Sequence, residues 1–413
     1  MEVEQNQKEI GLLISTMDPR SLGGVTTSYE AFIKVFSKIP EFNKALAYSS
    51  TQAGDPANVT LNSFCRGVFS PQIIKEEINK IPSFKVGYYF PKIEFQRHRT
   101  NFKLWQPLLK KFPIHQVISG VAYDAFPHAL AGVKFVLWIG TDIESERATH
   151  LKSYSWGKRL LVSIQTPELL KMEEFVLQRA SWVFAISEAS RNRLIARGCP
   201  KEKISVLSFP IETTSLSFSE DRIEPPTIVW AGRLNDSRKN TPFLIQAFRT
   251  VLNKIPTAKL KLVGPQTNSS LQQLCQQLGV LNSVEFLGEL PYERVLEVFQ
   301  RATVFAIPSL QEGLCIAGIE AMAAGLPVIS TRCQGPESYV IQEKTGYLVN
   351  SELEMAQRLI EVLSNRSMWE TMQSHCLSYI KQECSPHKFL ENILTCYAEV
   401  WPEYRSEFFK SFT

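Results

Sequence analysis

Residues 303–331, TVFAIPSLQEGLCIAGIEAMAAGLPVIST, carry the pattern that decides the fold. The stretch predicts a short apolar strand at residues 304–307, a Pro-Ser turn, a loop with glutamate and glycine, a helix of small residues and a second buried strand. Gly325 followed by Pro327 is typical of a helix end. Because both strands are short and apolar, we expect a sheet that is covered on both faces.

Polar groups of the same stretch indicate which ligand it could bind. Glu312 follows the first strand, and Glu320 lies in the helix. The helix would begin near Cys315 and Ile316, where free backbone N–H groups and the positive end of the helix dipole favour an anion. The two carboxylates can accept hydrogen bonds from hydroxyl groups. These features favour a ligand that is both phosphorylated and rich in hydroxyls, such as a nucleotide sugar.

The composition predicts an ordinary soluble protein of two domains. The chain has 413 residues, 44% of them hydrophobic and 21% charged. The net charge of +4 is mild and, without any nucleic-acid motif, does not indicate nucleic-acid binding. The polar start is not typical of a signal peptide, and no apolar run approaches the roughly 20 residues that span a bilayer. We expect a cytoplasmic location, with peripheral contact to an anionic inner membrane face left open.

The sequence favours neither a metal nor a cofactor. Its eight cysteines are scattered, which favours reduced thiols. His375, Cys376, Cys384 and His387 lie close together, but their spacing fits no standard zinc pattern. The chain has no Asp-x-Asp motif, the usual carboxylate pair for a divalent cation. We therefore expect metal-independent chemistry.

The second half of the chain alternates strands and helices regularly. Strands are predicted at TIVWAG, AKLKLVG and SVEFLG, each followed by a helix of suitable length. This rhythm predicts a parallel sheet with right-handed crossovers. Residues 214–226 are polar, end in proline and lack periodicity, so they are interpreted as an interdomain linker.

The first half shows the same pattern more weakly. A strand at residues 10–15 is followed by a turn with Gly23 and Gly24 and by a helix at about residues 25–39. The two glycines would let the backbone approach an anion closely, although many such turns only connect elements. Ligands of parallel sheets bind outside the carboxyl ends of the strands, so we expect these glycines, Arg233 and Glu312 to converge on one cleft.

Two further segments of the first half leave alternatives open. Residues 91–112 mix basic and aromatic side chains, which could contact an anionic membrane or an acidic acceptor. An ordinary half-buried helix is the favoured interpretation. Another helix is predicted at residues 167–180, beginning at Pro167.

The loop GRLNDSRKN, residues 232–240, has the charges that a diphosphate needs. Arg233 directly follows a predicted strand, and Lys239 precedes a helix. Arginine offers a bidentate fork and lysine a mobile point charge, and a departing diphosphate needs this neutralisation most in the transition state. A solvated basic loop is the alternative, and Arg238 is interpreted in that way.

Glu312 and Glu320 could also be the acid and nucleophile of a glycosidase. A nucleotide sugar, however, carries its own leaving group and needs no acid from the protein. We therefore assign Glu312 to the hydroxyls of a donor sugar and Glu320 to those of a ribose. Glu320 is conspicuous because its helix otherwise consists of small and apolar residues.

With these motifs together, the sequence resembles the retaining GT-B glycosyltransferases of family four. The match is specific over residues 227–350. EGLCIAGIEAMAAGLPVIST resembles the E-x7-E block of that family, GRLNDSRKN its phosphate-binding segment, and SVEFLGEL the strand and loop beside the nucleobase. The E-x7-E spacing and the basic loop favour a transferase over a sugar-nucleotide epimerase.

The resemblance implies an α/β fold of two Rossmann-like domains whose parallel sheets face an interdomain cleft. Residues 1–213 would form the acceptor-binding domain and residues 214–226 the linker. Residues 227–388 would bind the nucleotide sugar. The helical pattern of residues 389–413 predicts a helix that returns to the first domain, with a frayed, partner-binding tail as the alternative.

The resemblance also implies the reaction and the residues that carry it. A hexosyl group would pass from a nucleotide-diphosphate sugar to a hydroxyl acceptor with retention, and the departing phosphate would take the acceptor's proton. The catalytic residues would be Arg233, Lys239 and Glu312. The donor-binding residues would be Gly23, Gly24, Arg233, Lys239, Leu287, Leu314, Cys315, Ile316 and Glu320.

The first half departs from the family pattern at two places. Residues 139–142, Ile-Gly-Thr-Asp, replace a usual His-Gly pair, and residues 209–212, Phe-Pro-Ile-Glu, replace Asn-Gly-x-Asp. Asp142 or His128 is the candidate substitute on the acceptor side. A module that binds a nucleotide sugar or a partner protein without efficient catalysis is the alternative function.

Overall fold

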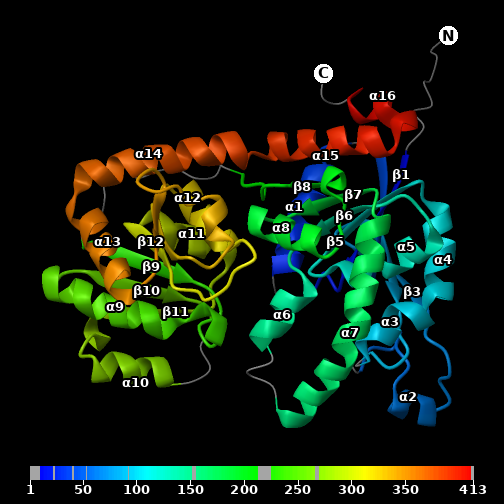
Figure 1. The fold of residues 1–413 in the computed structure, drawn as a ribbon, viewed down its shortest axis with the longest axis horizontal. Helices are drawn as coiled ribbons and strands as arrows, with labels where there is room; N and C mark the ends of the chain where they lie inside the picture. The colour runs from blue at the N-terminus through cyan, green and yellow to red at the C-terminus, as the bar shows by residue number, and fades with distance from the viewer. Residues whose placement is uncertain are drawn as a thin grey trace. The chain divides into compact units, whose positions relative to one another are not determined.

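The computed structural model describes residues 10–21, 24–39, 41–52, 54–91, 93–150, 155–212, 225–265 and 269–410. The chain divides into two compact units (Figure 1). Unit 1 contains Met1–Leu207 and Phe389–Thr413, and unit 2 contains Ser208–Lys388. The chain therefore leaves unit 1, builds unit 2 and returns. Gly23 and most of the predicted linker, residues 214–224, lie outside the described residues.

Unit 1 is an α/β structure around one largely parallel sheet, with the strand order β3-β4-β2-β1-β5-β6-β7-β8 among its described residues. The elements are β1 (Ile10–Met17), α1 (Gly24–Phe36), β2 (Phe42–Ser49), α2 (Leu61–Cys65), β3 (Ile73–Ile78), β4 (Ile81–Val86), α3 (Glu94–Thr100), α4 (Phe102–Lys111), β5 (Ile114–Ser119), α5 (Phe126–Ala131), β6 (Val136–Ile139), α6 (Ile143–His150), α7 (Trp156–Arg179), β7 (Trp182–Ala185), α8 (Glu188–Ala196), β8 (Ile204–Val206), α15 (Pro386–Val400) and α16 (Arg405–Phe408). Strand β1 pairs in parallel with β2 on one side and with β5 on the other. The strands before β5 therefore extend the sheet on one side of β1, and β5 and the later strands extend it on the other side.

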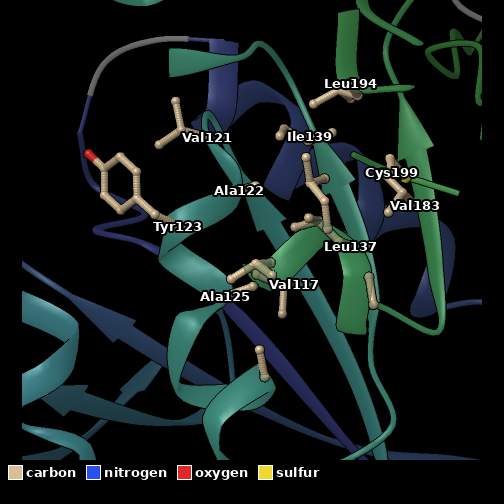
Figure 2. Packing of buried hydrophobic residues seen from close by; sticks show 14 of the residues in the cluster. Val117, Val121, Ala122, Tyr123, Ala125, Leu137, Ile139, Val183, Leu194 and Cys199 are labelled. Carbon is tan, nitrogen blue, oxygen red and sulfur yellow. The ribbon is translucent and has the colours of Figure 1, made fainter. Parts of the chain in front are cut away.

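The core of unit 1 is formed by apolar side chains of adjacent strands that pack under helices. Figure 2 shows Val117, Leu137 and Val183, which come from β5, β6 and β7, beside Ala122 and Ala125 of the segment after β5. All five are buried. Strands β5 and β6 are buried along their whole length, which is typical of parallel sheets that are covered on both faces.

The last helices of the chain pack into unit 1. The rings of Phe32 and Phe389 meet edge to face with centroids 4.9 Å apart. The Tyr397 hydroxyl donates a hydrogen bond to Oε1 of Gln116 on β5 at 2.8 Å. Both aromatic residues of α15 are buried. These contacts make residues from the end of the chain part of the first core.

Unit 1 differs from the sequence expectation at one edge of its sheet. Strands β3 and β4 form an antiparallel hairpin, whereas the expected fold class names only parallel sheets. Asn79 and Lys80 make the turn, and both have positive φ, 52° and 63°. This conformation suits a two-residue hairpin turn, in which asparagine is common but lysine is not. The second turn residue thus conceals the hairpin in the sequence.

Helix α7 also begins earlier than expected. The prediction places a helix at residues 167–180, whereas α7 spans Trp156–Arg179 with Pro167 inside it. The reason for the error is that proline is favoured in the first turn of a helix, so Pro167 looked like a start. The additional turns of α7 lie between Trp156 and Pro167.

The described part of residues 91–112 is an ordinary half-buried segment, which is the interpretation that the sequence favours. Trp105, Leu108 and Leu109 of α4 are buried in a core cluster with residues of β1, β2 and β4. The apolar face of this helix is therefore occupied by the protein itself.

Unit 2 confirms the predicted parallel α/β structure. Its sheet has the strand order β11-β10-β9-β12-β13-β14 among the described residues, and all pairs are parallel. The elements are β9 (Thr227–Ala231), α9 (Thr241–Lys254), β10 (Lys259–Val263), α10 (Ser270–Gln277), β11 (Val284–Gly288), α11 (Tyr292–Gln300), β12 (Val304–Ile307), α12 (Ile316–Ala323), β13 (Val328–Thr331), β14 (Gly346–Val349), α13 (Glu352–Ser364) and α14 (Arg366–Glu383).

The strand order of unit 2 determines where a ligand can bind. Helices α9, α10 and α13 lie on one face of the sheet, and α11 and α12 lie on the other (Figure 1). Strand β9 has β10 on one side and β12 on the other, so successive connections leave β9 and β12 in opposite directions. Ligands of parallel sheets bind at such a point, outside the carboxyl ends of the strands. The loops after β9 and β12 meet there.

Candidate active site

An ion pair joins the two loops at this point of unit 2. Nζ of Lys239 lies 2.7 Å from Oε1 and 2.9 Å from Oε2 of Glu312. The side chains are 17% and 8% exposed. Lys239 ends the loop after β9, and Glu312 lies in the loop after β12. The structure thus brings together two of the residues that the sequence singles out.

Local turn chemistry positions Lys239. The Asp236 carboxylate accepts a hydrogen bond from the backbone N–H of Arg238 at 3.0 Å and begins a 3-10 turn, Ser237–Lys239. Asn240 follows with φ of 46° and precedes α9. The N–H of Leu310 donates to the carbonyl of Arg238 at 2.7 Å, which ties the loop after β12 to this turn.

Arg238 and Arg233 both pair with Asp236. The Arg238 guanidinium donates to both carboxylate oxygens, at 3.1 Å for Nε to Oδ1 and 2.6 Å for Nη2 to Oδ2. Arg238 is therefore part of the turn and not a solvated side chain, which corrects the sequence interpretation. Arg233 lies 3.5 Å from Asp236 and is 63% exposed. Its charge faces solvent, in the same loop as Lys239.

Glu312 is fixed by its neighbours on both sides. The Ser309 hydroxyl donates to Oε1 of Glu312 at 2.6 Å. The backbone N–H of Glu312 donates to the carbonyl of Cys333 at 2.8 Å, and the N–H of Gly335 donates to the carbonyl of Glu312 at 3.2 Å. A Cβ on Gly335 would lie 2.6 Å from Cα of Leu314, so only glycine lets the segment after β13 support this loop.

The electrostatics of the ion pair favour its charged form. Burial by itself lowers the pKa of Lys239, but the Glu312 carboxylate outweighs that effect and raises it above the ordinary value. The ammonium also lies 5.8 Å from the ring centroid of Trp230, which is buried. A lysine in this setting remains a fixed positive charge at the edge of the sheet.

The loop ends at the N-terminus of α12 in a backbone conformation that is unusual for its residue. Cys315 caps the helix with φ of 63° and is buried, as is Leu314, whereas Ile316 is half-buried. The Tyr339 hydroxyl donates to the carbonyl of Cys315 at 3.1 Å. Gly318 allows this contact, because a Cβ there would lie 2.3 Å from the Tyr339 hydroxyl oxygen. The first N–H groups of α12 therefore have a defined direction.

Glu320 belongs to a separate contact on the next turns of α12. Its half-buried carboxyl group is hydrogen-bonded to Tyr292, which begins α11. Burial raises the pKa of Glu320 to about 7, and the Tyr292 hydrogen bond opposes this shift. Sequence reasoning missed Tyr292, since a tyrosine at the start of a helix belongs to no motif. Leu287, near the end of β11, is half-buried.

The candidates of unit 1 occupy different surroundings. Gly24 begins α1, and a Cβ at this residue would have no atom within 4 Å. The structure therefore gives no packing reason for glycine there. His128 on α5 is completely buried, with Nε2 at 3.2 Å from the Ser15 hydroxyl and its ring beside Trp105 and Phe135.

Asp142 is engaged within unit 1 as a helix cap and ion-pair partner. It is 1% exposed, accepts hydrogen bonds from the N–H and hydroxyl of Ser145, and receives Nε of Arg193 at 2.6 Å. Burial by itself raises its pKa, but the Ser145 N–H and Arg193 outweigh this and lower it. The contacts of Asp142 and His128 are those of residues that hold unit 1 together.

The described residues contain no group of three or more His, Cys, Asp or Glu side chains that could hold a metal ion. Cys376 instead donates to the carbonyls of Leu326 and Thr345 inside unit 2. Likewise, no helix in the described part of the chain is long and apolar enough to cross a membrane.

Comparison with known families identifies the segment that contains the ion pair. Residues 214–379 match the family model described as glycosyl transferases group 1. A D-inositol 3-phosphate glycosyltransferase of Corynebacterium urealyticum is 31% identical over 133 residues, which are 30% of this chain and 31% of that protein. The amylovoran biosynthesis glycosyltransferase AmsK of Erwinia amylovora is 26% identical over 53% of this chain and 52% of its own length. The chain thus spans about half or less of these curated relatives.

Solved structures match over nearly the whole chain and show the fold. The galactosyltransferase WaaB of the lipopolysaccharide outer core has a TM-score of 0.67 with 16% identity, over 94% of this chain and 99% of its own. HepE of Anabaena, solved in complex with UDP-glucose, has a TM-score of 0.69 with 16% identity, over 95% and 100% of the two chains. The fold is therefore GT-B, with two Rossmann-like α/β domains, as the sequence predicts.

Proposed function

We propose that this protein is a retaining glycosyltransferase that moves a hexosyl group from a nucleotide-diphosphate sugar to a hydroxyl acceptor. The observation that carries the proposal is the Lys239–Glu312 ion pair at the carboxyl ends of β9 and β12. It lies in the segment that matches the group 1 glycosyl transferases. HepE, of the same fold, was solved with UDP-glucose, which supports a nucleotide sugar as the donor.

The ion pair retains hydrogen-bonding capacity for such a donor. An ammonium has three N–H donors and a carboxylate has about four acceptor positions. Among the described residues, Lys239 directs two bonds to Glu312, and Glu312 accepts a third from Ser309. One N–H of Lys239 can therefore serve a phosphate oxygen, and one lone pair of Glu312 can accept from a sugar hydroxyl.

The other donor contacts follow from the same placement. The exposed guanidinium of Arg233 would bind the second phosphate in bidentate geometry. The N–H groups of Leu314, Cys315 and Ile316 would receive the donor at the start of α12. Glu320 would accept from the ribose hydroxyls. Leu287 would contact the base, and Gly24 would admit the diphosphate to the start of α1.

In the transition state, negative charge grows on the departing diphosphate, and Arg233 and Lys239 would stabilise it without a metal ion. The leaving phosphate oxygen would take the acceptor's proton on the same face of the sugar, which gives retention. Glu312 would orient the sugar through its hydroxyls and would not attack the anomeric carbon.

Donor binding and transfer can be tested separately. Thermal unfolding with a panel of UDP- and GDP-sugars is expected to identify a donor, because a ligand at 100 times its Kd stabilises the folded state by about 2.7 kcal/mol. Nucleotide release with that donor and a panel of hydroxyl acceptors then reports transfer. The anomeric configuration of the product, read by proton NMR, tests retention, and unchanged turnover in EDTA tests metal independence. A complete absence of donor stabilisation would contradict the proposal.

A donor-binding protein without efficient transfer is the second candidate. The observation that favours it is Asp142, a candidate substitute for the missing histidine on the acceptor side, which is buried and paired with Arg193. Under this alternative, a donor of the panel gives a thermal shift. Nucleotide is released neither by transfer to any acceptor nor by hydrolysis of the donor.

A further inference from the structure

The first turns of α7 carry large apolar side chains that face solvent. Trp156 is 82% exposed, Ile164 66%, Leu160 50% and Leu161 45%. In Figure 1 these turns form the lower end of α7, the end that is farther from β6 and β7. Single exposed apolar residues are ordinary, but four within nine positions of one helix are an unusual concentration that indicates an interaction surface.

The spacing shows that this patch is separate from the face that packs in the core. Successive helix residues are about 100° apart, so Trp156, Leu160 and Ile164 lie along one side. Five of the seven buried residues of α7 lie on the other side: Val162, Gln165, Leu169, Met172 and Val176. The other two, Glu173 and Leu177, belong to its later turns. Helix α7 therefore has two apolar faces, one packed in unit 1 and one open to solvent.

The charged residues within these turns have one sign. Residues 155–166, SWGKRLLVSIQT, contain Lys158 and Arg159 and no acidic residue. Both basic side chains are exposed. A helix with an apolar face, a tryptophan and nearby basic residues is typical of segments that lie in the interface of an anionic bilayer.

We infer that the first turns of α7 bind the surface of an anionic lipid membrane. Trp156, Leu160 and Ile164 enter the headgroup region, and Lys158 and Arg159 contact the lipid phosphates. Contact at the surface agrees with the finding that no described helix is suited to cross a bilayer. Residues 91–112 are a poorer candidate, because Trp105 and Leu108 on their helix are buried.

The test measures sedimentation of the full chain with vesicles of phosphatidylcholine, either pure or containing phosphatidylglycerol. The unmodified protein is expected to bind the anionic vesicles and to bind them less in 1 M salt. The triple variant Trp156→Ser, Leu160→Gln, Ile164→Gln should lose at least tenfold in affinity. Lys158→Gln and Arg159→Gln should each lower affinity for anionic vesicles about fivefold.

A matched control separates this surface from general hydrophobicity. Leu353 on α13 is 61% exposed but stands between Glu352 and Glu354, so Leu353→Gln should leave vesicle binding unchanged. Ile164→Gln alone provides a second test if the triple variant unfolds, with an expected loss of severalfold.

Three outcomes would overturn the inference. The first is equal binding of the triple and unmodified proteins to anionic vesicles. The second is binding of the unmodified protein to pure phosphatidylcholine vesicles that equals its binding to the anionic vesicles. The third is a concentration-dependent dimer in sedimentation velocity that the triple variant abolishes, because the patch would then belong to a contact between two copies. Since nucleotide release plays no part, the outcome is independent of the catalytic proposal.

Discussion

Lys239 and Glu312 form a two-bond ion pair although 73 residues separate them in the sequence. The pairing follows from the sheet, because β9 and β12 are neighbours and their following loops emerge side by side. Each charge is largely buried and neutralises the other. Removal of one partner therefore changes both the stability of the protein and the charge that is available to bind a donor.

Lys239→Met is expected to weaken donor binding and to destabilise the protein together. The variant leaves the Glu312 carboxylate buried without its ammonium, which costs about 3–5 kcal/mol. Donor-induced thermal shift should fall severely, and any turnover should fall by at least tenfold. Lys254→Met, at the exposed end of α9, is the control and should change neither quantity. A donor response equal to that of the unmodified protein would remove Lys239 from the proposed phosphate site.

Glu312→Gln should separate binding of the sugar from neutralisation of Lys239. Glutamine keeps the shape and one acceptor oxygen but removes the charge, so we expect turnover to fall far more than affinity for the free nucleotide diphosphate. Ser309→Ala removes one hydrogen bond to Glu312 and should cost about 0.5–1.5 kcal/mol in stability with a smaller loss of turnover. Steady-state kinetics and titration calorimetry with the nucleoside diphosphate measure the two effects. Unchanged kinetics in Glu312→Gln would contradict its assignment to the donor sugar.

Glu320 should make stability and nucleotide affinity depend on pH near neutrality. Its pKa of about 7 in the folded protein exceeds the ordinary value of 4.5. The folded state therefore binds more protons between these values, and the free energy of unfolding contributed by this group falls as the pH rises from 4.5 to 7. Affinity for a ribonucleotide should instead rise through pH 7, because the ionised carboxylate is the better acceptor for ribose hydroxyls. Titrations at pH 6 and 8 measure this difference.

Two variants check the origin of that pH dependence. Glu320→Gln should abolish it in both stability and affinity. Tyr292→Phe removes the hydrogen bond that lowers the pKa of Glu320, so the midpoint of the affinity profile should move to higher pH. A profile that is identical in Tyr292→Phe would show that Tyr292 does not set the ionisation of Glu320.

Two glycines should respond differently to alanine. Gly335→Ala places a Cβ 2.6 Å from Cα of Leu314 and should lower the melting temperature by several degrees and weaken donor binding, since the loop of Glu312 must move. Gly24→Ala meets no atom within 4 Å and should fold normally, yet it should weaken donor binding if its N–H approaches the diphosphate. Gly54→Ala, also without neighbours, is the control for both. Differential scanning calorimetry with and without donor distinguishes the cases.

Strand adjacency explains which parts of the site could be predicted. The regular alternation after residue 227 predicts a parallel sheet, and a parallel sheet places its loops at one edge. The contact between Lys239 and Glu312 follows from this topology. The support of Glu312 by Ser309 and the segment of Cys333 does not, because it depends on the precise path of two loops.

In the rest of the molecule, contacts between residues far apart in the sequence limit what could be predicted. His128 contacts Ser15, 113 residues away, and Asp142 contacts Arg193, 51 residues away. Their residue types suit an acceptor site, and no local pattern reveals that they have partners inside unit 1. Similarly, Pro167 looks like a helix start, whereas α7 begins at Trp156. Residue type predicts which chemistry a side chain can perform, but it does not predict whether that side chain is already bonded to a partner inside the protein.

The return of the chain into its first core has a practical consequence for dissecting the protein. Cutting at the boundary after Leu207 would not yield two independent halves, because the amino-terminal piece would lack the ring of Phe389 against Phe32 and the hydroxyl of Tyr397 on Gln116. Such a piece would expose aromatic surface and is expected to precipitate. A soluble amino-terminal half should instead require the missing segment, added in trans as a peptide or fused after Leu207 through a flexible tether.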